Sequence, residues 1–285
     1  MVNQGHYKDK FITVNGVRLH YLDWGNEKMP VIIFLPGLSA TGHDFDPIAS
    51  CLQDKFHCIA LDQRGQGDSQ WADSYEEEEF TRDIAGFVYA LKFGRISLVG
   101  HSLGGRTGMF FAGTYPGKMD RLVIVDMAAE VDSGQTTKYS DSTPPGTRSS
   151  FSSIDDFIAF QRQRMPKAKE EPLRTYVTCS TRELPDGTRV YKHDPKLERI
   201  AHFLQKDVPS VVVIVPWQIV AQIKCPTLII RGSDSFVLSR GVAQKMKATI
   251  ARAELAEIEG ASHGIHVDKP DELKEVVERF FRENR

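Results

Sequence analysis

The feature that most constrains the fold of this chain is a set of short apolar runs without polar alternation. These runs cover residues 31–35, 57–61, 96–99, 122–125 and 227–230. Such runs are typical of strands that are buried on both faces, as in a parallel sheet. Segments with helical spacing of apolar residues lie between or after them, at residues 80–91, 105–115, 241–250 and 271–281. This alternation predicts an α/β fold with a doubly wound sheet and right-handed crossovers.

Further strands are expected near both ends of the chain. Two β-rich runs, 10–14 and 17–24, are separated by Asn15 and Gly16, the pair that most strongly predicts a tight hairpin. Residues 253–258 predict one more strand before the last helix. The sheet is therefore expected to have eight strands and to be mostly parallel, with an antiparallel hairpin at its start.

The alternation of strands and helices stops after residue 131. Residues 132–153 are rich in Ser, Thr, Gly and Pro, and amphipathic pieces follow around residues 154–164, 171–179 and 197–204. We interpret residues 132–216 as an insertion that follows the sixth strand. The core would then consist of residues 1–131 and 217–285.

Composition narrows the class of protein. The 36 Lys and Arg residues against 38 Asp and Glu give a net charge of −2, which excludes a general binder of nucleic acid because phosphate contacts need a clustered basic excess. The N-terminus has no secretory apolar region, and the longest apolar runs, such as 211–216, are too short to span a bilayer. We expect a cytoplasmic protein that binds no membrane. The four cysteines lack C-x-x-C spacing, which favours buried thiols over disulfides or a zinc site.

The segment Gly100-His101-Ser102-Leu103-Gly104 lies directly between a predicted strand and a predicted helix. This context is typical of a nucleophile elbow, in which glycines flank a serine on a turn that has no room for side chains. A serine hydroxyl needs a base to become a nucleophile. His263 follows the last strand on a loop at the carboxyl edge of the sheet, where Ser102 also lies, so we predict that it is the base.

The other histidines near these motifs fit that role less well. The side chain of His101 is expected to point away from Ser102, and His57 begins a strand. His266 is three residues beyond His263, but no nearby Asp, Glu or Cys completes a metal site with this pair. We therefore expect no metal and no organic cofactor.

Several stretches together resemble the α/β-hydrolase fold superfamily over nearly the whole chain. They are Leu35-Pro36-Gly37-Leu38, the turn at residues 61–69, the elbow, and residues 260–263 with Asp268-Lys269-Pro270. The resemblance implies a serine hydrolase that cleaves a small-molecule carboxylic ester or lactone through an acyl-enzyme intermediate. It also implies that the insertion at residues 132–216 is a helical cap. A carbon–carbon bond hydrolase, a thioesterase, a lyase and a slow-turnover ligand receptor share the same fold and triad and stay open.

The acid that orients His263 has two candidates, because relatives place it after either of two strands. Asp126 ends the strand at residues 122–125, while Asp234 follows the strand at residues 227–230. Many relatives carry the acid as Gly-x-x-Asp after the later strand, but the third residue after Gly232 here is Ser235. We favour Asp126, and the other carboxylate would cap a helix or bind loop amides.

The remaining motif residues concern the oxyanion and the loops around it. A tetrahedral intermediate needs fixed N–H donors, and we predict that the amide of Leu103 and, by the resemblance, that of Leu38 supply them. The turn containing Asp62 and Arg64 is expected to hold neighbouring loops in place. Arg106 is interpreted as a packing or ion-pairing residue, although a lyase of this fold with a similar elbow uses this arginine to contact its substrate.

Overall fold

The computed structural model describes residues 7–132, 149–198 and 211–283, and its central element is an eight-stranded sheet. The strand order is β1-β2-β4-β3-β5-β6-β12-β13; β1, β2 and β4 pair antiparallel, and every other neighbouring pair is parallel. The predicted α/β fold with a mostly parallel sheet is confirmed. The strands are β1 (Lys8–Val14), β2 (Val17–Asp23), β3 (Val31–Leu35), β4 (His57–Leu61), β5 (Ile96–His101), β6 (Met119–Val125), β12 (Thr227–Gly232) and β13 (Ala253–Ile258).

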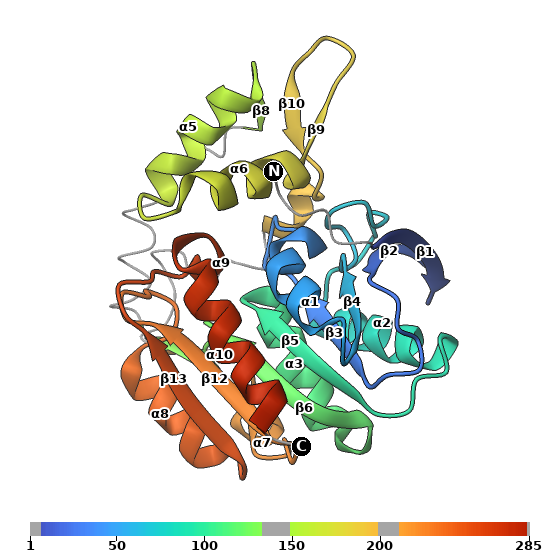
Figure 1. The fold of residues 1–285 in the computed structure, drawn as a ribbon, viewed down its shortest axis with the longest axis vertical. Coiled ribbons are helices and arrows are strands. Elements are labelled where there is room, and N and C mark those ends of the chain that lie inside the picture. Colours follow the sequence, from blue (N-terminus) through green and yellow to red (C-terminus); the bar gives the residue numbers. More distant parts are fainter. Residues whose placement is uncertain (1–6, 133–148, 199–210, 284–285) are drawn as a thin grey trace.

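Alternate side chains of the inner strands enter two separate apolar cores. In β3, Ile33 and Leu35 belong to one core, whereas Ile32 and Phe34 belong to the other. Helices therefore cover both faces of the sheet (Figure 1), and this explains why these strands show no polar alternation. The first core contains residues of α2 (Glu77–Ala90), α3 (Leu103–Thr114), α7 (Trp217–Val220) and α8 (Arg240–Thr249), and the second those of α1 (Asp46–Leu52), α9 (Ile265–Asp268) and α10 (Pro270–Glu283).

The hairpin between β1 and β2 forms where Asn15 and Gly16 predicted it. Val14 pairs with Val17, and the two turn residues have φ values of 50° and 79°. A two-residue turn with positive φ at both positions matches the twist of the strands, and asparagine and glycine tolerate this conformation best.

The predicted insertion leaves and rejoins the core at one place. β7 (Glu130–Asp132) pairs antiparallel with β11 (Val211–Val213), so the two ends of the insertion lie side by side. Between them are α5 (Ile154–Arg164) and α6 (Glu170–Ser180), together with a small sheet of β8 (Ser150–Phe151), β10 (Arg189–Tyr191) and β9 (Thr181–Glu183). The insertion is thus a mixed unit rather than a purely helical one, and Figure 1 shows it beyond one edge of the core sheet. Most of the segments predicted at 132–153 and 197–204 lie outside the described residues.

Two further expectations can be compared with the described part of the chain. None of its helices is long and apolar enough to cross a bilayer. All four cysteines are free thiols; Cys58 and Cys225 are buried, whereas Cys51 and Cys179 are half-buried.

Candidate active site

Ser102 lies on a sharp turn between β5 and α3, and its backbone is strained. Its φ of 49° is in the left-handed region that serine rarely adopts. The flanking glycines are required by close backbone contacts. A Cβ on Gly104 would lie 2.0 Å from the carbonyl oxygen of Leu35, and one on Gly100 would lie 2.2 Å from that of Gly104. The turn therefore has the tight geometry that the Gly-x-Ser-x-Gly motif predicts.

The structure brings Ser102, His263 and Asp126 together at the carboxyl edge of the sheet. The Ser102 hydroxyl lies 3.0 Å from Nε2 of His263, and Nδ1 of His263 lies 2.8 Å from Oδ2 of Asp126. A carboxylate only accepts hydrogen bonds, so Nδ1 carries the proton and donates it to Asp126. Nε2 is then free to accept the proton of the Ser102 hydroxyl, and this is the tautomer that a general base needs.

Asp126 is completely buried and is held by the end of β12 and the loop that follows it. Its own N–H donates to the carbonyl oxygen of Ile230 at 2.8 Å, and its φ is 47°. The N–H of Gly232 donates to Oδ1 at 3.0 Å, and the hydroxyl of Ser235 donates to Oδ2 at 2.5 Å. With the bond from His263, three donors satisfy this carboxylate, which a buried charge requires.

Asp234 does not reach His263. Its half-exposed carboxylate pairs instead with Lys167 of the insertion, which lowers its pKa. The position where many relatives carry the acid is occupied by Ser235, and this serine donates to Asp126. Sequence reasoning noted Ser235 only as a departure from the Gly-x-x-Asp pattern; its contact with Asp126 is a role that the sequence alone did not reveal.

Leu38 and Leu103, the two predicted oxyanion donors, belong to one apolar cluster beside Ser102. Buried Leu103, Phe80 and Leu197 form this cluster, and Leu38 packs against it. Leu103 is the first residue of α3, so its N–H has no acceptor within the helix. Leu38 lies in the loop after β3, where the N–H of Ala40 donates to the carbonyl oxygen of Gly37. Leu103 is thus part of the elbow, and the loop of Leu38 lies against it, since a Cβ on Gly37 would lie 3.4 Å from Cβ of Ser102.

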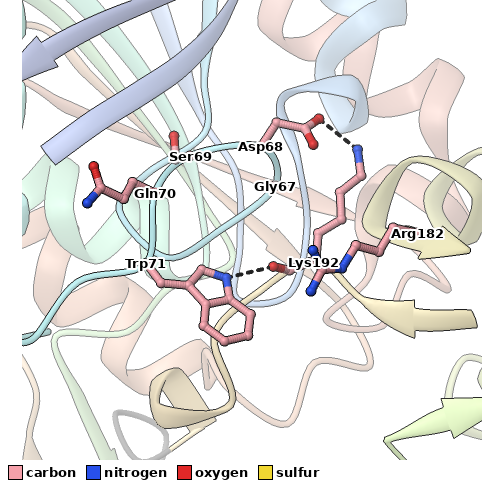
Figure 2. Close-up of a pocket in the computed structure, with 7 residues that line it drawn as sticks. All are labelled: Gly67, Asp68, Ser69, Gln70, Trp71, Arg182 and Lys192. Atoms are coloured by element: carbon pink, nitrogen blue, oxygen red, sulfur yellow. Dashed lines mark hydrogen bonds and ion pairs between the residues drawn. The ribbon is translucent and has the colours of Figure 1, made fainter. Parts of the chain in front are cut away.

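The insertion is fastened to the core near this edge by polar contacts. Nζ of Lys192 lies 2.7 Å from Asp68, and the indole N–H of Trp71 donates to the carbonyl oxygen of Lys192 at 3.0 Å. Figure 2 shows both contacts beside an open cavity of about 380 Å³. In addition, the N–H of Asp194 donates to the carbonyl oxygen of Gly65. These contacts fix the segment that carries Leu197 over the elbow.

The turn at residues 61–69 is held by Asp62 and by Arg64. Asp62 accepts hydrogen bonds from the N–H groups of Gly42 and Asp68, and Arg64 makes two hydrogen bonds to buried Asp83. Ligand atoms of His20, Asp62 and Asp68 lie within 4.8 Å of one another, a spacing that could surround a cation. However, His20 already binds Asp62, and Lys192 already pairs with Asp68. The arrangement therefore fits the structural role expected for the turn better than a metal site.

Two charged or titratable pairs near the elbow are also buried. Nε of Arg106 lies 2.6 Å from Glu77, the ion pairing expected for this arginine, and burial raises the pKa of Glu77. The sequence showed no carboxylate that would complete a metal site with His263 and His266, and the fold brings one carboxylate, that of Asp44, to 3.2 Å from Nε2 of His266. Burial raises the pKa of Asp44, and burial together with His263 lowers the pKa of His266 to about 3, so the ring of His266 is neutral near pH 7.

Comparison with known proteins agrees with this architecture. A family model described as the alpha/beta hydrolase fold matches residues 30–270. The chain belongs to the α/β-hydrolase fold family. Proteins that share one fold can catalyse different reactions, so membership of this family does not by itself fix the reaction.

The relatives of this α/β hydrolase include several hydrolases. The 2-(acetamidomethylene)succinate hydrolase of Mesorhizobium japonicum is 24% identical and aligns over 97% of this chain and 96% of its own length. Human serine hydrolase BPHL is 27% identical over 95% of this chain and 85% of its own. The crystal structure of E-2-(acetamidomethylene)succinate hydrolase has a TM-score of 0.85 at 23% identity, covering 97% of this chain and 99% of that one. That structural likeness supports the fold.

Proposed function

We propose that this protein is a serine hydrolase that cleaves a small-molecule carboxylic ester or lactone. The observation that carries the proposal is the hydrogen-bonded series from Ser102 through His263 to Asp126, with Ser102 on the strained elbow. In this proposal Ser102 is the nucleophile, His263 the base and Asp126 the orienting acid that acyl transfer needs.

In the proposed reaction, Ser102 attacks the acyl carbonyl while His263 accepts the hydroxyl proton at Nε2. Asp126 holds the imidazole and stabilises the positive charge that develops on it. The N–H groups of Leu38 and Leu103 would donate to the oxyanion of the tetrahedral intermediate. His263 then gives its proton to the leaving alcohol as the ester bond breaks. In the second half, His263 takes a proton from water as the water oxygen attacks the acyl carbonyl, and it returns this proton to the Ser102 oxygen as the carboxylic acid leaves. No step in this scheme needs a metal or an organic cofactor.

The immediate surroundings support a substrate with an apolar acyl group. Leu103, Phe80 and Leu197 are buried beside the elbow, and Leu38 packs against them, so an acyl chain at Ser102 would meet aliphatic and aromatic side chains. We expect the substrate to be a small molecule, since the balanced charge of the chain favours neither nucleic acid nor an anionic membrane surface.

A relative suggests one further substrate for testing. The Mesorhizobium japonicum protein is named a 2-(acetamidomethylene)succinate hydrolase, and it aligns with this chain over almost the full length of both. Attack by Ser102 on the carbonyl of an acetamido group would use the same base, acid and oxyanion donors as attack on an ester. This compound therefore belongs in the substrate panel beside simple esters.

The test is hydrolysis of 4-nitrophenyl acetate, butyrate and octanoate by the wild type and by Ser102→Ala, with labelling by a fluorophosphonate. We expect wild-type turnover, covalent labelling of Ser102, and loss of both in Ser102→Ala. Circular dichroism checks that the variant is folded. If wild type and variant hydrolyse the esters and the acetamido compound equally slowly and neither is labelled, the proposal is wrong. A thioesterase, a carbon–carbon hydrolase, a lyase or a ligand receptor would then be tested next.

A further inference from the structure

His101, which immediately precedes Ser102, is buried and hydrogen-bonded to the backbone of His263. Its side chain is almost inaccessible to solvent, and its Nε2 lies 2.9 Å from the carbonyl oxygen of His263. A carbonyl oxygen can only accept a hydrogen bond. Nε2 of His101 therefore carries a proton and donates it to the loop that holds His263.

The surroundings of His101 keep its ring neutral and fixed. Burial, together with the neighbouring His266 and His263, lowers the pKa of His101 well below the usual range of histidine. The ring centroid lies 4.9 Å from that of His263 and 4.7 Å from that of His266. With the proton on Nε2, the neutral ring leaves Nδ1 as a bare acceptor, and this atom is buried without a hydrogen-bond partner among the described residues.

The bare Nδ1 atom faces the loop that carries Leu38. A Cβ on Gly37 would lie 2.8 Å from Nδ1 and 3.3 Å from Cε1 of His101, so the ring fits only because residue 37 has no side chain. His101 thus contacts the loop after β3 on one side and the backbone of His263 on the other. Because it is also part of the elbow, one imidazole connects the backbones that present Ser102, His263 and the proposed oxyanion donor.

We propose that His101 is a positioning residue for the reaction, which keeps the His263 loop at the correct distance from Ser102. This inference rests on the proposed function for its kinetic consequence, but its structural consequence is independent of any substrate. The hydrogen bond from His101 ties the base to the same turn that carries the nucleophile. Without it, the His263 backbone loses this direct link to the elbow, and small displacements of a reacting group are costly to catalysis.

Three variants separate positioning from packing. His101→Leu keeps an apolar side chain of moderate size but removes the donor, whereas His101→Gln keeps an N–H donor at a similar reach. His57→Leu is the matched control, because His57 is also buried and hydrogen-bonded, to Asp23, but lies at the opposite end of the sheet strands. If His101→Leu does not fold, His101→Asn replaces it, since the shorter amide does not reach the carbonyl oxygen of His263.

We expect His101→Leu to lower kcat about 10- to 100-fold with KM changed by less than about threefold, as for a misplaced catalytic group. His101→Gln should restore kcat to within about fivefold of the wild type because its donor remains. His57→Leu should lower the melting temperature without lowering kcat. If His101→Leu or His101→Asn keeps kcat within about twofold of the wild type, His101 only fills space and the inference is overturned.

A second readout needs no turnover. The proton between Nδ1 of His263 and Asp126 should give a low-field NMR resonance in the wild type, in Ser102→Ala and in His57→Leu. We expect this resonance to broaden or disappear in His101→Leu and to return in His101→Gln. An unchanged resonance in His101→Leu would refute the positioning role. The NMR readout tests the positioning role of His101 separately from the proposed hydrolase. If the wild type neither turned over esters nor was labelled at Ser102, only the proposed hydrolase would be contradicted.

Discussion

Replacement of Asp126 by asparagine should disable the reaction while leaving the fold intact. In the wild type, Oδ1 accepts from the N–H of Gly232 at 3.0 Å, and Oδ2 accepts from Nδ1 of His263 at 2.8 Å. In Asp126→Asn we expect the amide oxygen to face Gly232, because the backbone N–H of Gly232 can only donate. The Ser235 hydroxyl, which donates to Oδ2 in the wild type, can rotate to accept from the amide instead. The amide NH₂ group then faces Nδ1 of His263. Nδ1 can accept a hydrogen bond from this group only when it carries no proton.

The consequence is the wrong tautomer of His263. With Nδ1 bare, the proton of a neutral imidazole must be on Nε2, which then cannot accept the proton of Ser102 at 3.0 Å. The same substitution in a serine protease of known mechanism lowers kcat by about 10⁴-fold. We expect a decrease of this order here, equivalent to about 5 kcal/mol of transition-state stabilisation.

The assay is steady-state hydrolysis of 4-nitrophenyl butyrate together with the rate of fluorophosphonate labelling. Asp234→Asn is the matched control, because Asp234 is exposed and pairs with Lys167, so its kcat should stay within about twofold of the wild type. The reasoning would be refuted if Asp126→Asn kept more than about a tenth of wild-type kcat. It would equally be refuted if Asp234→Asn were the inactive variant.

Three further substitutions test other contacts. Ser235→Ala removes a donor to Asp126, so kcat should fall about tenfold and the free energy of unfolding by about 1–3 kcal/mol; unchanged kinetics and urea unfolding would contradict this. Lys167→Met breaks an exposed ion pair with Asp234, so the free energy of unfolding should change by less than about 1 kcal/mol; a larger loss in urea would show that this contact holds the insertion. The pKa of buried His266 is about 3, so between this value and about 6.5 the unfolded chain binds a proton that the folded chain does not. The contribution of His266 to the free energy of unfolding is therefore full above about pH 6.5 and is lost as the pH falls toward about 3. Between pH 7 and 5 the free energy of unfolding should fall by about 2 kcal/mol more in the wild type than in His266→Leu. Equal losses would disprove the lowered pKa of His266.

The core sheet was readily predicted because its strands are buried on both faces. The run at 31–35 matches β3 residue for residue, since all five side chains are buried. By contrast, β6 begins at Met119, three residues before its apolar run, because Asp120 and Arg121 are only half-buried and interrupt the pattern. The strands of the small sheet in the insertion are two or three residues long, too short for any periodicity to develop.

The sequence favours Asp126 over Asp234 but leaves both as candidates, because each follows a strand of the same sheet. β6 and β12 are neighbours, so both carboxylates lie near one edge. Backbone direction distinguishes them: Asp126 has a positive φ and turns into the core, while Asp234 is exposed toward Lys167. The role of His101 was equally hidden, since a contact with the carbonyl oxygen of a residue 162 positions away leaves no local pattern.

The pairing of β7 with β11 keeps the sequence of the inserted segment separate from the spacing of the candidate catalytic side chains. The chain leaves and returns through one three-residue ladder, in which Val131 lies opposite Val212. Ser102, Asp126 and His263 all lie outside the segment between these strands, on the turns of the core sheet. A different segment could therefore be grafted onto this ladder without altering the spacing of the three side chains. On the proposed function, we expect that exchange of this segment would change substrate preference while Ser102, Asp126 and His263 stayed in place.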